Sequence, residues 1–245
     1  MDGALRLLQS CGPNLTKSFP EIKPILSGFG RIAVHMFIQR RQPTFLSDPE
    51  WTSQSSLTDM TNARDRLTSL AFDVPRILHA TDRLHRDQCT KSKLTEDAAL
   101  LLQDIHLLQT KLESWMTEVE QSIGGDLFWL SSETKIPRPQ VIDPKCSPKH
   151  KIGLQQLSFA NGTIAGLLVH YWSSHLELLM VEDLLQQLPE TIKETVVSRN
   201  VCQKADETAQ LIMEAHPYLS SCFEGIIGLQ LSMESVKRYF AQMRS

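Results

Sequence analysis

The sequence lacks any cluster of cysteines. Five cysteines are scattered along 245 residues, and no two of them form a CxxC pair: Cys11, Cys89, Cys146, Cys202 and Cys222. A disulfide framework or a structural zinc site needs closely spaced ligands, so this spacing predicts free thiols in a reducing compartment. We therefore expect no metal site and no other cofactor.

A surplus of basic residues is also missing. Lys and Arg number 25 against 28 Asp and Glu, which gives a formal net charge of −3. A domain that binds DNA directly usually has a clear basic excess, because phosphate contacts supply much of its affinity. Direct DNA binding is therefore not expected, and no residue is assigned to it.

Long apolar runs are absent as well. Polar residues interrupt every apolar stretch before it reaches the ~20 residues that span a bilayer. The first residues, MDGALRLLQSCGP, contain too short an apolar stretch for a signal peptide. We expect no association with a membrane and a location in the cytosol or the nucleus.

The signatures of common catalytic sites are missing too. The sequence contains no HExxH, GxSxG, GxxxxGKS/T or GxGxxG motif. The closest carboxylate pairs, Glu118 with Glu120 and Glu182 with Asp183, lie on strongly helical stretches where solvated faces are expected. We therefore expect that the chain is not an enzyme. Sequence alone leaves open a Cys–His pair that meets only in space.

What the sequence does contain is apolar periodicity of the helical kind. The clearest stretch has apolar residues spaced by three and four: Leu94, Ala98, Leu101, Ile105, Leu108, Leu112, Trp115, Val119 and Ile123. Similar spacing predicts helices over 2–10, 25–41, 59–87 with a kink or split at Pro75, 94–123, 153–187, 189–215 and 223–243. No strand is expected. The sequence predicts an all-α fold, a single bundle-like domain over 1–245 with six to eight helices.

One long segment has no helical pattern. Four prolines lie within residues 126–150, namely Pro137, Pro139, Pro144 and Pro148. Proline removes a backbone donor and disrupts a regular helix. An irregular, proline-rich loop of this length is uncommon inside a domain and is either a functional loop or a linker.

A candidate binding site lies on the predicted helix over 153–187. This stretch is apolar over half its circumference, which is typical of a central helix in a bundle. Four of its side chains could line a cavity between helices, and we take them as candidate ligand-binding residues: His170, Tyr171, Trp172 and His175. The alternative is that these residues are hydrogen-bonded or packed members of the core.

Three stretches resemble the regulatory region of fungal zinc-cluster transcription factors. The first comprises Gly12-Pro13, a helix that bears an arginine (here Arg31), and the loop from Arg41 to Trp51, RQPTFLSDPEW. The second is LSFAN (157–161) followed by YWSSHL (171–176). The third runs from Ala205 to Phe240 and contains AQLI (209–212), PY (217–218) and GIIGLQ (225–230).

This resemblance implies a helical regulator of transcription in the nucleus that acts through protein partners, either another regulator or a second copy. It also links such proteins to secondary-metabolite gene sets. The chain departs from the family in having no six-cysteine cluster and in the LSMES segment after Gln230. Two alternatives follow from the residues: a small-molecule-binding or accessory biosynthetic helical protein, and an assembly scaffold with an exposed leucine-rich seam.

Overall fold

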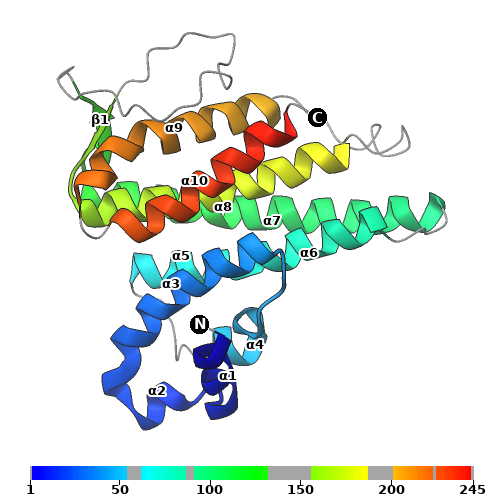
Figure 1. Ribbon diagram of the computed structural model, residues 1–245, viewed down its shortest axis with the longest axis horizontal. Helices are drawn as coiled ribbons and strands as arrows, with labels where there is room; N and C mark the ends of the chain where they lie inside the picture. The colour runs from blue at the N-terminus through cyan, green and yellow to red at the C-terminus, as the bar shows by residue number, and fades with distance from the viewer. Residues whose placement is uncertain are drawn as a thin grey trace.

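Helices form most of the described chain (Figure 1). A computed structural model describes residues 2–53, 62–86, 91–131, 156–186, 201–222 and 225–243. The helices there are α1 (Asp2–Cys11), α2 (Leu15–Ser18), α3 (Lys23–Arg40), α4 (Pro49–Ser53), α5 (Ala63–Ala71), α6 (Asp73–Arg86), α7 (Lys91–Ile123), α8 (Gly162–Gln186), α9 (Val201–Ser221) and α10 (Gly225–Gln242), with 3-10 turns η1 (Pro20–Ile22) and η2 (Phe45–Ser47).

The all-α prediction is confirmed. Within the described residues, eight of the α-helices have nine residues or more, and only α2 and α4 are shorter. None of the described helices is both long enough and apolar enough to cross a membrane. Most of the predicted proline-rich loop, residues 132–150, lies outside the described residues.

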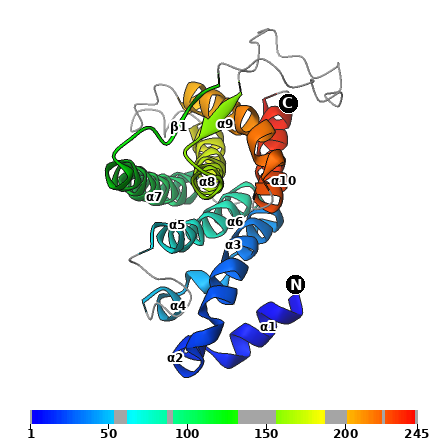
Figure 2. The same ribbon diagram turned by 90° about the vertical axis from the view of Figure 1, so that its left-hand side faces the viewer.

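Helix α8 occupies the centre of the fold. It contacts α5, α6, α7, α9 and α10, and Figure 2 shows it end-on with these helices around it. Its sequence is apolar on all sides, and 18 of its residues are buried. A helix with no polar face is stable only when neighbours cover its whole circumference, which explains its central position.

Helix ends follow local signals that the sequence contains. Phe72 separates α5 from α6, so Pro75 lies in the first turn of α6, where its missing N–H removes no intrahelical hydrogen bond. The predicted split near Pro75 is confirmed. Helix α7 ends before Gly124, whose φ of 67° is easily adopted only by glycine. The long helix predicted over 94–123 is confirmed with three additional residues at its start.

Three sequence predictions were wrong. Two short strands exist: β1 (Phe128–Leu130) pairs antiparallel with β2 (Leu157–Phe159). Helix α8 begins at Gly162 instead of residue 153, because the Asn161 side chain accepts the Ile164 N–H at 2.9 Å and starts the helix there. Helix α9 continues past His216 and Pro217 to Ser221.

The extension of α9 has a packing explanation. Leu219, beyond the proline, is buried in the core, and the Tyr218 ring lies 5.0 Å from the Phe159 ring of β2. Burial of these side chains offsets the hydrogen bond that Pro217 cannot donate. The predicted start of this helix at Pro189 falls in residues 187–200, which are outside the described part of the chain.

Candidate functional site

The four predicted ligand-binding residues lie on different sides of α8. Tyr171 is stacked on Trp115 of α7, with ring centroids 5.7 Å apart, and on His175, at 5.8 Å. Trp172 instead packs against Phe128 and Phe159 of the two strands. The structure therefore brings Tyr171 and His175 together and places Trp172 elsewhere in the core.

Burial of these side chains changes their acid–base properties. It raises the pKa of Tyr171 to about 12, with smaller contributions from nearby glutamates. It also lowers the pKa of His175 to about 4, assisted by the positive charge of Lys204. Both groups are therefore neutral at neutral pH, which suits packed core positions.

His170 makes a contact of its own, with His35 of α3. Its Nδ1 lies 2.9 Å from Nε2 of His35, and the two rings meet edge to face. Burial lowers the pKa of His35 to about 4, and burial also lowers the pKa of His170 well below 6.5; the charge of Arg31 adds to both effects. In this geometry the N–H of one neutral imidazole can donate a hydrogen bond to the unprotonated nitrogen of the other. The other nitrogen of His170, Nε2, is buried and has no hydrogen-bond partner.

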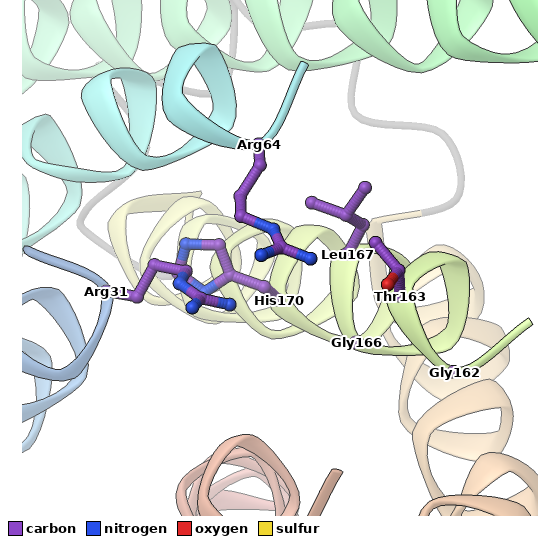
Figure 3. A pocket seen from close by; sticks show the side chains of 7 residues that line it. All are labelled: Arg31, Arg64, Gly162, Thr163, Gly166, Leu167 and His170. Atoms are coloured by element: carbon purple, nitrogen blue, oxygen red, sulfur yellow. The ribbon is translucent and has the colours of Figure 1, made fainter. Parts of the chain in front are cut away.

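A small pocket of about 30 Å³ lies beside His170 at the N-terminal end of α8 (Figure 3). Arg31 reaches it from α3 and Arg64 from α5. Helix α8 supplies the remaining lining residues, which are Gly162, Thr163, Gly166, Leu167 and His170. Of the four residues predicted from the sequence, only His170 lines this pocket. Within the described part of the chain, no carboxylate lines it.

Glycine keeps this part of α8 open. A Cβ atom at Gly166 would meet no atom within 4 Å, so the pocket exists partly because no side chain fills it. The N–H groups of Gly162 and Thr163 at the start of α8 have no intrahelical acceptor, whereas that of Ile164 is capped by Asn161, and this end of the helix has a partial positive charge. The pocket therefore combines two guanidinium groups, a helix N-terminus and an imidazole nitrogen.

Glu182 and Glu118, two of the carboxylates considered as acid–base candidates, have structural contacts. Glu182 Oε2 accepts a hydrogen bond from Gln109 Nε2–H at 2.9 Å. Its Oε1 lies 3.2 Å from Nε2 of His106, and both contacts link α8 to α7. Glu118 pairs with Arg66 of α5. Within the described ranges, no three His, Cys, Asp or Glu side chains come together as a metal site would require.

A second polar cluster is buried between α8 and α10. Arg238 Nη2 donates to Glu177 Oε1 and also to Ser235 Oγ at 3.1 Å. Glu177 is fully buried, and its Oε2, the Nε of Arg238 and the Oγ of Ser174 have no hydrogen-bond partner. We interpret the cluster as the ionic link between these two helices.

Sequence reasoning missed most of the pocket. Arg31 was singled out only as the arginine of the family-like block, and Arg64 gave no signal, because nothing in its surrounding sequence marks it as a ligand-binding residue. The pocket depends on the packing of three helices that are distant in sequence. Among the described residues, the fold and this pocket define a mostly helical protein with a small pocket lined by two arginines. The sequence shows no significant match to a protein-family model, to a curated protein or to a solved structure.

Proposed function

We propose that this protein is a helical transcription regulator related to fungal zinc-cluster factors, that it works in the nucleus, and that it acts through protein partners. The proposal rests on the three family-like stretches of the sequence. It extends to a role beside a secondary-metabolite gene set, and it assigns no catalytic step to the chain.

The observation that carries the proposal is where the family-like residues lie. Arg41 forms a two-pronged pair with Asp82, with N–O distances of 2.7 to 2.9 Å. Trp51 is buried against Phe45, and Asn161 caps α8. The first family-like block therefore supplies a link from the end of α3 to α6, and the second supplies the N-cap of the central helix. Structural positions of this kind are expected of residues that specify a shared helical framework.

An exposed apolar surface supports action through a partner. Leu100 and Leu107 are 57% and 55% exposed and lie one heptad apart on α7. Residues seven apart lie on nearly the same face of a helix. Helix α7 is at the edge of the bundle in Figure 2. We propose that this face, called the α7 seam, packs against a helix of another regulator.

The test is a pull-down from a fungal nuclear extract with the tagged full chain. We expect a zinc-cluster regulator to be enriched and identified by mass spectrometry, and the purified regulator to bind the purified chain. The variant Leu100→Lys/Leu107→Lys should lose this binding. Leu7→Lys is the matched control, because Leu7 is 66% exposed on α1, away from α7.

Two results would contradict the proposal. One is tight, sequence-specific binding of the purified chain alone to a promoter fragment, because the proposed mechanism works through a partner. The other is equal recovery of the regulator with the α7 seam variant and with the wild-type chain, which would place the partner on another surface.

A further inference from the structure

The unpartnered nitrogen of His170 points to a ligand. The His170 side chain is only 6% exposed, and its Nε2 has no hydrogen-bond partner although it lies in the interior. An unsatisfied buried polar atom is costly, so each one in a folded protein calls for an explanation. Because His170 also lines the pocket at the start of α8, a group bound in that pocket can supply the missing partner.

The charges around the pocket select an anion. Arg31 and Arg64 approach it from two different helices, and in Figure 3 the Arg31 side chain ends beside His170 while the Arg64 side chain ends between His170 and Leu167. The positive charge of Arg31 helps to lower the pKa of His170, because it disfavours the protonated ring. The N-terminal end of α8 adds its partial positive charge and its first-turn N–H groups. Among the residues that the structure describes, none of those lining the pocket is a carboxylate.

The His35 contact can fix the proton of His170 in the orientation that an anion needs. When His35 Nε2–H donates to Nδ1 of His170, the remaining proton of the neutral His170 ring lies on Nε2. This nitrogen then donates a hydrogen bond. His35 is therefore a positioning residue, and His170 is a direct ligand.

The volume limits the size of the bound group. About 30 Å³ holds about two to three water-sized atoms. This is enough for two or three oxygens of an oxyanion group whose remaining atoms lie at the open side of the pocket, and too little for a large apolar metabolite. We propose that the pocket binds a phosphate group, held by Arg31, Arg64, His170 and the N-terminus of α8. The proposal goes beyond the regulatory function above and stands independently of it.

The test is a titration of the full chain with inorganic phosphate, and in parallel with glycerol phosphate, followed by amide NMR shifts. Sodium chloride at equal ionic strength is the blank. We expect saturable shifts at the Gly162, Thr163 and Gly166 amides. Tighter binding of glycerol phosphate would identify a phosphorylated metabolite as the source, and equal binding would identify free phosphate. Absence of saturable shifts with both probes overturns the proposal.

Variants locate the site. Arg64→Met should weaken binding about tenfold, the effect of losing one charge-assisted hydrogen bond. Arg66→Met is the matched control, because Arg66 belongs to the same helix but pairs with Glu118 and does not line the pocket. Equal weakening by the two variants would show a non-specific charge effect and overturn the proposal.

A second variant keeps the test decisive if Arg64→Met does not fold. Gly166→Asp adds a carboxylate to an open position of the pocket, where a Cβ meets no other atom within 4 Å. The tethered carboxylate should occupy the cationic site and abolish the phosphate-induced shifts while the helical circular dichroism is retained. Unchanged phosphate binding in this variant would place the anion elsewhere.

Discussion

His170 Nδ1 and His35 Nε2 lie 2.9 Å apart in the interior, although the two residues are 135 positions apart in the sequence. The contact links α8 to α3 through two rings that are both less than 10% exposed. Protonation of both rings would bring two positive charges into contact in a setting that hydrates neither of them. Burial lowers the pKa of both rings, so at neutral pH the folded state holds the pair neutral.

This relationship predicts that acid destabilises the fold before most carboxylates titrate. Burial lowers the pKa of His35 and of His175 to about 4, against 6.5 for an ordinary histidine. Below pH 6.5 the unfolded chain binds protons that the folded chain does not, so the free energy of unfolding is greatest above pH 6.5 and falls towards pH 4. Each such histidine contributes a slope of up to about 1.4 kcal/mol per pH unit.

Urea unfolding at a series of pH values from 7.5 to 5 measures this slope. The His35→Gln variant should show a smaller slope, because one of the buried histidines has been removed. His85→Gln is the control for loss of a histidine as such, because His85 is exposed at the end of α6. A free energy of unfolding that does not change between pH 7 and 5 would contradict neutral burial of these rings.

The Arg41–Asp82 pair should stabilise the loop that follows α3. Arg41 contacts both carboxylate oxygens of Asp82, and the two side chains are 28% and 24% exposed. Arg41→Ala should lower the free energy of unfolding by about 1 kcal/mol, and Arg41→Lys should recover little, because lysine lacks the planar fork that makes two parallel hydrogen bonds.

Arg86 offers a matched control for that experiment. It approaches the same Asp82 carboxylate at 3.8 Å, but its side chain is 71% exposed. Arg86→Ala should change stability by less than about 0.5 kcal/mol, as is usual for solvated pairs. Thermal or urea unfolding measures both variants, and a larger loss for Arg86→Ala than for Arg41→Ala would reverse this interpretation.

The buried Glu177–Arg238 pair should show strong coupling in a double-mutant cycle. Glu177 is fully buried, whereas the Arg238 side chain is 29% exposed. Arg238→Met leaves a buried carboxylate without its partner and should cost about 3 kcal/mol or more. Glu177→Gln should cost less, because the exposed part of Arg238 can be hydrated.

The double variant Glu177→Gln/Arg238→Met should be more stable than Arg238→Met alone, because it removes the buried carboxylate charge that has lost its partner. Urea unfolding of the four proteins gives the coupling energy. Lys237→Ala is the control on the same helix, because the Lys237 side chain is 67% exposed in its pair with Glu234. Additive effects at Glu177 and Arg238 would show that the pair is not a coupled unit.

The sequence predicted the parts of the fold that depend on local signals. The three-and-four spacing up to Ile123, followed by Gly124, defined the end of α7. The start of α8 was missed because apolar residues continue upstream of Asn161, into a three-residue strand too short to show its own period.

The pocket could not be predicted in the same way. Arg31, Arg64 and His170 come from three helices, and which sides of these helices meet is decided by packing over the whole core. Within any one of these described helices, the order of polar residues does not indicate that the three side chains come together at a pocket. Of the candidate residues, His170 was chosen for its chemistry, and its neighbours Tyr171 and Trp172 have packing contacts instead.

Alanine substitutions at two glycines should have opposite effects on stability, because the backbone conformations at the two positions differ. Gly166 lies inside α8, and an added Cβ would meet no atom within 4 Å. Gly166→Ala should therefore raise the free energy of unfolding by about 0.5 to 1 kcal/mol, because alanine loses less backbone entropy on forming a helix. Gly124 also has open space around it, but its φ is 67°. Gly124→Ala should lower stability by about 1 kcal/mol, because a side chain disfavours the left-handed region. Urea unfolding of both variants separates the two causes, since space is available at both positions and only the backbone angle differs; equal effects would contradict the explanation.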